Sequence, residues 1–283
     1  MNENKQKIIE RYYQYSTPYL LKYWSDKESM SIHYGFWYPE TKSRSEAFLN
    51  QHRSVVELLQ PSADDYILDI GCGVGGVSTW LAQHTPARYV GITLADNQIR
   101  MARQLAQRRK VADRTAYSRM DFFKTSFNDN TFTKAFAIES ICHSYPRQLE
   151  VFREMYRILK KGATLLISDS ALFRQATGKQ ELKWVKNFCN GWAMTDYSTI
   201  NDIVISLKKA QFKNIRIIDR TKLVSRNINQ IYWIGIWSYP LLKIKQLLGH
   251  LPKIVLGNNL AAVTQKKLVN ADLAGYFSII AHK

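Results

Sequence analysis

Short β-rich runs alternate with helical segments through the middle of the chain, and this alternation constrains the fold more than any other feature. The β-rich runs are YILDI (66–70), RYVGIT (88–93), AFAIES (135–140) and TLLISDS (164–170). The helical segments between them are 75–84, 96–110 and 147–162. The last one ends in Lys-Lys-Gly, which predicts a helix C-terminus capped at Gly162. Strands separated by helices at this spacing form right-handed βαβ units, so we expect a parallel sheet covered by helices.

The flanking sequence extends this pattern at both ends. The first 60 residues are helical in character and dense in aromatic side chains. After Ser170 a long stretch of aromatic and polar sequence interrupts the alternation, which resumes with a helix at 199–211 and strands at 213–220 and 275–283. We therefore expect one wound α/β core with a helical cap. The predicted divisions are a helical lid at 1–60, a core at 61–170, and cap insertions with the last core strands at 171–283.

A glycine-rich turn, ILDIGCGVGG (67–76), follows the first core strand. Without Cβ atoms, backbone N–H groups there can approach a ligand closely at the positive end of the next helix. The spacing of Gly71, Gly73 and Gly76 also fits a dinucleotide site or a purely structural turn. Two residues oppose a dinucleotide. Asp69 would repel a pyrophosphate but suits a cationic ammonium group, and Thr93 stands where a ribose-binding acid is expected.

The segment LDIGCGVGG closely resembles the first motif of class I S-adenosylmethionine-dependent methyltransferases, D-x-G-x-G-x-G. GITLADNQIRMAR (91–103) resembles the second-strand segment of the branch that contains sterol C-methyltransferases, tocopherol methyltransferases, cyclopropane fatty-acid synthases and natural-product O-methyltransferases. Residues 135–162 are similar to the fourth strand and following helix of this branch, particularly in the sterol enzymes, and IHYGFW (32–37) to its lid motif. The resemblance covers roughly residues 12–170. It implies a Rossmann-like sheet of about seven strands, mostly parallel with an antiparallel last strand.

The resemblance implies S-adenosyl-L-methionine as the cofactor and assigns its contacts. Asp69 and the glycine turn would hold the methionine end, and Thr93 with Gln98 would replace the usual acid at the ribose. Asp121 would accept from the adenine amino group beside the Phe122 backbone, although an aspartate there also suits a turn or cap. The full predicted set is Asp69, Gly71, Cys72, Gly73, Thr93, Gln98, Asp121, Phe122 and Glu139, the last as a cofactor or structural contact.

The chemistry of a sulfonium methyl narrows the search for catalytic residues. Such a methyl is already activated, so an enzyme mainly aligns an in-line displacement and excludes water. A hydroxyl acceptor also needs a general base, expected at the carboxyl ends of the core strands. His143 and Asp169 match the positions of the His and Asp base pair in some natural-product O-methyltransferases. The alternative for His143 is a loop histidine that packs against the cofactor.

Aromatic side chains before the core suggest a lid over the cofactor and acceptor. Its candidates are Tyr12, Tyr15, Tyr34 and Trp37, because aromatic faces favour a sulfonium or a cationic intermediate. Tyr34 is the strongest candidate, since it lies inside the IHYGFW match. The alternative is ordinary packing of these residues against the core.

The positive charge is concentrated in the last part of the chain. Lys and Arg number 40 against 23 Asp and Glu, a formal net charge of +17, and residues 171–283 hold +12 of it. Residues 220–271 contain eight basic residues, no acid, and many Ile, Leu, Trp and Tyr. This composition is typical of a peripheral membrane element or a cap over a lipophilic substrate. A packed cap with solvated lysines explains it nearly as well.

Together these features predict a SAM-dependent methyltransferase that acts on a small lipophilic or polycyclic acceptor by O- or C-methylation. The three cysteines predict no disulfide framework and no metal site, and the sequence favours a cytoplasmic protein with or without peripheral membrane contact. A nucleic-acid methyltransferase suits the charge, but the segment after the fourth strand, AIESICH, lacks the Asn/Asp-Pro-Pro-aromatic sequence of amino-directed enzymes, so no nucleic-acid partner is expected. A non-catalytic SAM-binding membrane protein and a dehydrogenase stay as further alternatives.

Overall fold

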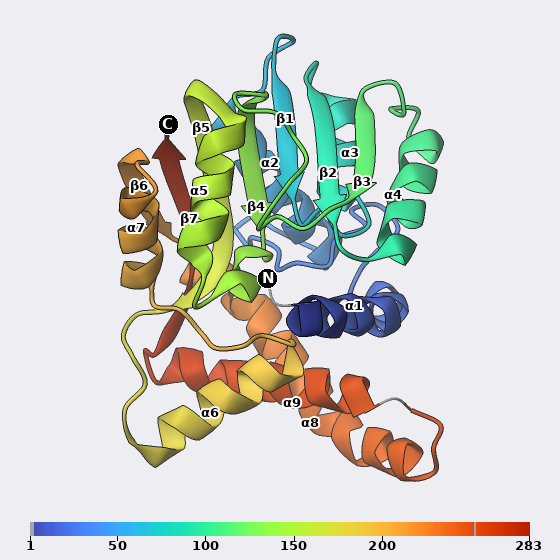
Figure 1. The fold of residues 1–283 in the computed structure, drawn as a ribbon. Coiled ribbons are helices and arrows are strands. Elements are labelled where there is room, and N and C mark those ends of the chain that lie inside the picture. The colour runs from blue at the N-terminus through green and yellow to red at the C-terminus, as the bar shows by residue number, and fades with distance from the viewer. Residues whose placement is uncertain (1–2, 252) are drawn as a thin grey trace.

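The structure is a computed structural model that describes residues 3–251 and 253–283. Its centre is a seven-stranded mixed sheet in the order β3-β2-β1-β4-β5-β7-β6, with helices on both faces (Figure 1). β7 runs antiparallel to both of its neighbours, and β1 to β5 are parallel, as predicted. The strands are β1 (Tyr66–Ile70), β2 (Arg88–Thr93), β3 (Thr115–Arg119), β4 (Phe132–Ile138), β5 (Leu159–Leu172), β6 (Lys213–Asp219) and β7 (Ala274–His282).

The alternating side chains of the strands bury two separate apolar layers. Leu68 and Ile70 point to the layer beneath α5 and α7, while Ile67 between them points to the layer beneath α2, α3 and α4. Because both faces are covered, the central strands are continuous apolar runs, which is why they could be recognised in the sequence. The core helices are α2 (Arg44–Leu59), α3 (Gly76–His84), α4 (Asp96–Arg108), α5 (Gln148–Ile158) and α7 (Ile200–Lys209).

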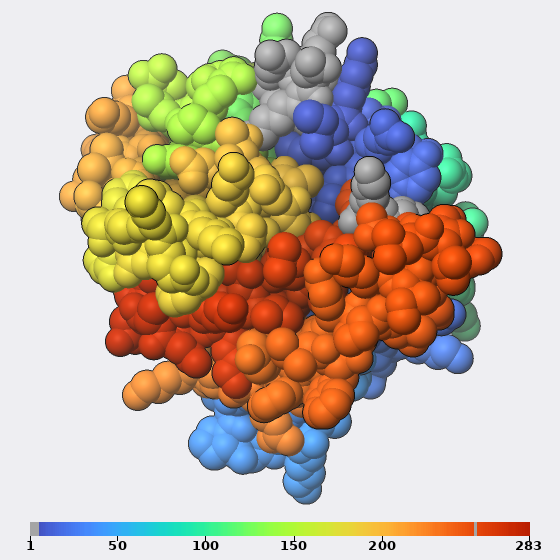
Figure 2. Space-filling view, turned by 90° about the horizontal axis from the view of Figure 1, so that it is seen from below, coloured from blue at the N-terminus to red at the C-terminus, as the bar shows by residue number. Residues whose placement is uncertain are grey.

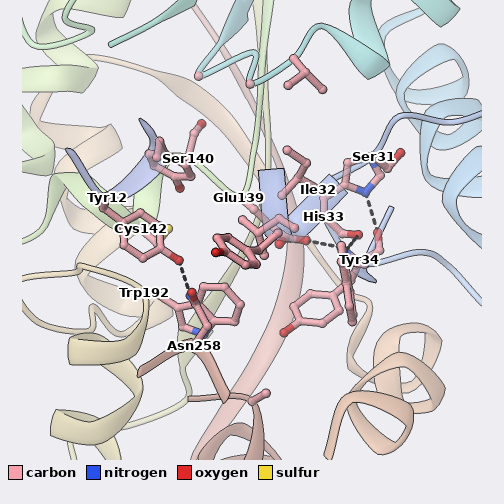
Figure 3. Close-up of a pocket in the computed structure, with 18 of the residues that line it drawn as sticks. Tyr12, Ser31, Ile32, His33, Tyr34, Glu139, Ser140, Cys142, Trp192 and Asn258 are labelled. Atoms are coloured by element: carbon pink, nitrogen blue, oxygen red, sulfur yellow. Dashed lines mark hydrogen bonds between the residues drawn. The ribbon is translucent and has the colours of Figure 1, made fainter. Parts of the chain in front are cut away.

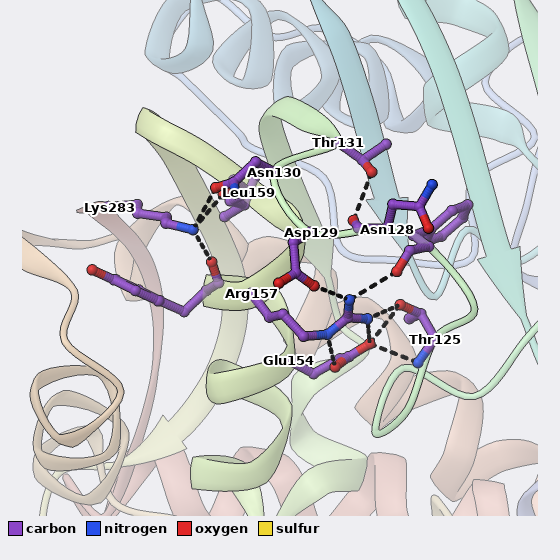
Figure 4. Close-up of polar contacts among 11 residues, drawn as sticks. Thr125, Asn128, Asp129, Asn130, Thr131, Glu154, Arg157, Leu159 and Lys283 are labelled. Carbon is purple, nitrogen blue, oxygen red and sulfur yellow. Dashed lines mark hydrogen bonds and ion pairs between the residues drawn. The ribbon is translucent and has the colours of Figure 1, made fainter.

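The end of α5 differs from the prediction. The helix stops at Ile158 and β5 begins with the next residue, so the predicted cap at Gly162 is wrong. Gly162 instead has φ +79° and donates its N–H to the carbonyl of Lys283. The ammonium of Lys283 donates to the carbonyls of Tyr156 at 2.6 Å and Leu159 at 2.7 Å (Figure 4). Besides Arg157 in the last turn of α5, a cation from a residue remote in sequence therefore lies at this helix end.

Four helices and a short 3-10 turn lie at the carboxyl edge of the sheet, on the cap side of the molecule (Figure 1). They are α1 (Glu3–Tyr23), η1 (Ile141–Ser144), α6 (Gly178–Gly191), α8 (Thr221–Leu247) and α9 (Lys253–Asn270). Seen from below, α6, α8 and α9 form most of this face (Figure 2). α6 approaches α9 closely, since a Cβ on Gly191 would lie 2.4 Å from that of Ala261.

The predicted lid region, 1–60, contains two helices with different surroundings. α1 lies between the sheet edge and the cap, whereas α2 buries Leu49, Val55 and Leu59 in the same apolar layer as α3. Only α1 and the segment that follows it reach over the carboxyl ends of the strands.

Candidate functional site

The order of the strands places a crevice between β1 and β4. From β1 the sheet continues to β2 and β3 on one side, and from β4 to β5 on the other, so the connections diverge at this point. A cavity of about 680 Å³ opens there, between the carboxyl ends of the strands and the cap. Its volume is in the range of pockets that bury small ligands. Asp69 of β1, Glu139 after β4 and Asp169 of β5 all line it.

The glycine turn combines close packing with an open backbone. Gly71 has φ +76°, and a Cβ there would lie 2.4 Å from the Ser140 Cβ, so a side chain would push β1 and β4 apart. Gly73, at φ +53°, would bring its Cβ within 4 Å of nothing. Both glycines and Cys72 line the cavity. The turn therefore exposes backbone to a ligand at the start of α3.

Asp69 is a buried carboxylate, and one of its two oxygens lacks a hydrogen-bond donor among the described residues. Its side chain is only 3% exposed, and its Oδ2 has no hydrogen-bond partner among the described residues. Burial raises the pKa of this carboxyl to about 7, against the opposing effect of a hydrogen bond from Ser78. A buried carboxylate of this kind is stabilised by a cation or donor from a ligand. The position thus fits an ammonium group.

Glu139 connects the sheet to the lid segment. Its Oε1 accepts the N–H of Tyr34 at 2.6 Å and the hydroxyl of Tyr276 at 3.0 Å (Figure 3). Its backbone has φ +49°, a strained conformation for a residue with a side chain. Burial raises the pKa of the Glu139 carboxyl to about 8. The structure therefore gives Glu139 a structural contact, one of the two roles predicted for it, and places it on the cavity wall as well.

His143 and Asp169 both line the cavity. His143 is bonded by a residue of α1, whereas Asp169 is bonded by backbone groups of η1 and β5. The carboxylate of Asp169 accepts the N–H of Cys142 at 2.9 Å and of Ser170 at 2.8 Å. Burial raises the Asp169 pKa to about 6. Nε2 of His143 shares a hydrogen bond of 2.7 Å with the hydroxyl of Tyr13 on α1. The imidazole is therefore held at the cavity wall with one nitrogen directed at the lid helix.

Thr93 and Gln98, the predicted ribose contacts, form one polar group at the end of β2. Thr93 Oγ1 donates to Gln98 Oε1 at 2.7 Å, and Gln98 Nε2 donates to Thr17 Oγ1 on α1 at 3.1 Å. Both line the cavity. Phe122 also lines it, whereas the Asp121 carboxylate accepts the N–H of Phe123 in a turn, the alternative considered for this residue.

The predicted lid aromatics separate into two groups. Tyr34 lines the cavity and its hydroxyl donates to Gln265 of α9. Tyr15 is 49% exposed, and it is absent from the described residues that line the cavity. Trp37 is also outside that lining, because its ring donates to Asn227 of α8 and stacks with Arg226. The geometry supports a lid position for Tyr34 and for Tyr12, which also lines the cavity.

Residues 68–167 match a family model described as a methyltransferase domain. This region is a methyltransferase domain. It contains β1, β2, β3, β4 and most of β5, together with the glycine turn and Asp69.

Similar sequences agree with this assignment over part of the chain. The methyltransferase GfsG of Streptomyces halstedii is 35% identical over 142 residues, which are 49% of this chain and 50% of that protein. The sterol 24-C-methyltransferase of Saccharomyces cerevisiae is 37% identical over 105 residues, 37% of this chain and 27% of that protein. The chain thus spans half or less of the length of these two relatives.

Solved structures extend the likeness to the whole fold. The cyclase SpnF superposes with a TM-score of 0.79 at 22% identity, over 99% of this chain and 96% of that one. The geranyl diphosphate C-methyltransferase of Streptomyces coelicolor A3(2) gives a TM-score of 0.74 at 18% identity, over 98% and 97% of the two chains. At this identity the likeness concerns the fold.

Two residues around the methyltransferase domain were missed by the sequence analysis as site residues. Tyr13 contacts His143, and Trp192 lines the cavity from the cap side (Figure 3). Tyr12, one of the lid candidates, lines the cavity and is bonded by Asn258 of α9. The density of aromatics in α1 was visible, but the contacts join residues more than a hundred positions apart. Among the described residues no cluster of metal-ligating side chains occurs, and no helix is long and apolar enough to cross a membrane.

Proposed function

We propose that this protein transfers the methyl group of S-adenosyl-L-methionine to a small lipophilic acceptor. The observation that carries the proposal is the buried Asp69 carboxylate with its unbonded Oδ2, beside a glycine turn at the crevice of the sheet. An α-ammonium group supplies both the charge and the donors that would stabilise this buried carboxylate. Sequence relatives named as methyltransferases and the matching domain model support the same cofactor.

The residues present fit the rest of the cofactor. Thr93 and Gln98 would bond the ribose hydroxyls, and the Phe122 backbone would lie beside the adenine. When bound, the cofactor supplies a sulfonium methyl that is activated for displacement. Glu139 and Asp169 place two further carboxyls on the same cavity wall, which Tyr34 also lines. A cation bound there would favour the ionised forms of these carboxyls and lower their raised pKa values.

The acceptor would occupy the half of the cavity that belongs to the cap. Its wall there is formed mainly by apolar and aromatic side chains, among them Phe188, Trp192, Met194, Ile231 and Leu242. Such a surface contributes to binding by burying apolar area of the ligand. Relatives named as sterol methyltransferases and structural neighbours named for geranyl diphosphate support the same class of acceptor.

His143 is the residue that would remove a proton from a hydroxyl acceptor. Its Nε2 now bonds the Tyr13 hydroxyl, so an acceptor hydroxyl in the position of that phenol would lie within reach of the base. Replacing His143 with Ala should then slow turnover about a hundredfold or more while cofactor affinity is kept. Unchanged turnover would remove His143 as the base and favour transfer to carbon.

Direct detection of methyl transfer tests the proposal. Purified protein is incubated with methyl-labelled S-adenosylmethionine and a fractionated lipid extract, and the labelled product is identified by mass spectrometry. A structural neighbour of this fold is named as a cyclase, so binding of the cofactor by calorimetry is measured separately from transfer. Absence of cofactor binding refutes the assignment, and binding without transfer to any fraction refutes the activity.

A second part of the proposal concerns where the protein meets its acceptor. We propose that the region 220–271, which includes α8 and α9, makes peripheral contact with a membrane. We also propose that the lid, core and cap act as three parts of one site. The basic and apolar composition of this region supports membrane contact.

A further inference from the structure

The outer face of α8 carries a stripe of large apolar side chains. Four residues of α8 and its C-cap follow one another at intervals of three or four residues, so they lie on one side of the helix: Trp233, Trp237, Leu241, Ile244 and the C-cap Leu248. Their exposed fractions are 53%, 79%, 55%, 55% and 65%. We call these five residues the α8 stripe. A contiguous exposed stripe of this kind marks a contact surface rather than ordinary scattered exposure.

The charges beside the α8 stripe are of one sign. Lys243 and Lys245 are exposed, and at 3.6 residues per turn they lie on opposite edges of the stripe. No acidic residue occurs anywhere in 220–271. Tryptophans on an apolar face with lysines at its edges match the interface of an anionic bilayer, where the rings lie at headgroup level and the ammonium groups reach lipid phosphates.

A second copy of this chain fits the stripe less well. A two-fold dimer would bring the same surface of each copy together, so the lysines of one would face the lysines of the other. Such like-charge contacts oppose association. The charge of the rim therefore favours an anionic lipid surface over self-association.

The α8 stripe is continuous with the lining of the cavity. Ile234 and Leu241 are each more than half exposed and also line the cavity, so they lie at its rim. Ser238 and Leu242, on the adjacent side of α8, continue the wall inward. Across the opening, Tyr23 at the end of α1 is 63% exposed and lines the cavity as well. A lipophilic ligand could pass along this surface with little exposure to water.

We propose that the α8 stripe docks on an anionic membrane surface and that the acceptor enters the cavity from the lipid, between α8 and the end of α1. The route of entry rests on the proposed function, because it requires a lipophilic acceptor. The docking itself depends only on the stripe and its lysines.

Vesicle sedimentation with the full chain tests the docking. The protein is mixed with vesicles of phosphatidylcholine and phosphatidylserine, or of phosphatidylcholine alone. We expect binding to the anionic vesicles, weakened by salt and about fivefold weaker in Lys243→Gln. Replacing Trp237 and Leu248 with Glu together should reduce binding about a hundredfold, since both side chains belong to the stripe and are 79% and 65% exposed. Ile205→Glu, at a 41% exposed position on α7, is the matched control and should bind normally.

The outcomes separate this inference from the proposed function. Cofactor affinity is measured by calorimetry on the same variants, none of which alters a residue that lines the cavity. Cofactor binding without vesicle binding overturns docking alone, and vesicle binding without cofactor binding overturns the methyltransferase proposal alone. Equal binding to neutral vesicles refutes the anionic-lipid assignment. If the double Glu variant instead converts a dimer to a monomer and no vesicles bind, the stripe belongs to a second copy.

Discussion

The core and the cap distribute apolar residues in different ways. α5 in the core buries Val151, Phe152, Met155 and Ile158 against the sheet, and the rest of its surface is mostly polar. α8 in the cap buries residues mainly in its first half, while its second half exposes the apolar stripe. The pattern of α5 is explained by folding alone. The second half of α8 is not explained by packing among the described residues, and this is the observation behind the proposed docking.

The two regions also divide the cavity by polarity. Asp69, Glu139 and Asp169 come from the core, whereas the cap contributes mostly apolar and aromatic side chains. A polar floor suits a charged cofactor that must be oriented, and an apolar roof suits an acceptor that is recognised by burial. This contrast can be tested by changes that affect one region and leave the other intact.

The largest expected difference is in folding stability. Phe136 in β4 is fully buried, so Phe136→Ala should lower the free energy of unfolding by about 3–5 kcal/mol through the lost contacts and the cavity left behind. Trp237→Ala removes a larger ring that is 79% exposed, and should change stability by less than about 0.5 kcal/mol. Urea unfolding of both variants measures this, and a large loss in Trp237→Ala would mean that the stripe is part of the folding core.

The next effect separates cofactor from acceptor binding. Asp69→Asn should weaken S-adenosylmethionine binding by about 3 kcal/mol, or a hundredfold, because the buried ammonium loses its charged partner. Trp192→Ala on the cap side should leave cofactor affinity unchanged and raise the KM for the acceptor. Asp65→Asn, at the start of β1 and paired with Lys134, is the control for loss of a buried carboxylate far from the cavity. Equal cofactor affinity in Asp69→Asn would contradict the assignment.

The sequence allowed the core to be predicted better than the cap for a physical reason. β1 and β2 lie where the apolar runs indicated, because each run is bounded by local turn chemistry. The end of α5 was predicted too late in the chain, because β5 begins at Leu159 and the carbonyls at the helix end bond Lys283, which is remote in sequence.

The same distinction holds for the candidate site. Asp69 belongs to a local motif, while Tyr13 meets His143 only after the fold brings α1 across the crevice. Trp37 lies in a recognisable segment, yet its partner, Asn227, is in α8, so its direction could not be read from nearby residues. Contacts between lid, core and cap are therefore the part of the site that required the structure.

A moderate effect is expected in how the stability of the folded state depends on pH, because the core contains buried acids. The pKa values of Asp69 and Glu139 are raised by burial to about 7 and about 8, so the folded state holds protons that the unfolded state has lost. Their stabilising contribution is complete at low pH and is lost as pH rises through these values, by about 2 kcal/mol between pH 6.5 and 8. The buried His33 has its pKa lowered to about 4 by desolvation, so its effect is confined below pH 6.5.

Thermal unfolding of the ligand-free protein across this range tests the sign. Glu139→Gln should make the stability of the folded state depend less on pH. The described residues of the cap contribute no buried acid to the cavity, so they should not replace this lost pH dependence. Stability that rises with pH above 6.5 would contradict the assignment of these carboxyls. S-Adenosylmethionine should also bind more tightly as pH rises through about 7, because the ammonium group requires ionised Asp69.

The smallest effect is expected at the helix that joins the two regions. Thr17 of α1 accepts a hydrogen bond from Gln98 in the core, and Tyr12 on the same helix is bonded by Asn258 in the cap. Thr17→Val keeps the shape of the side chain but removes one bond, worth about 1 kcal/mol, so α1 should open about fivefold more often. Limited proteolysis within α1 and the release rate of bound cofactor should both rise by that factor. Tyr15→Phe, on the exposed side of α1, should change neither. If Thr17→Val behaves like Tyr15→Phe, the cofactor is retained by core and cap without help from α1.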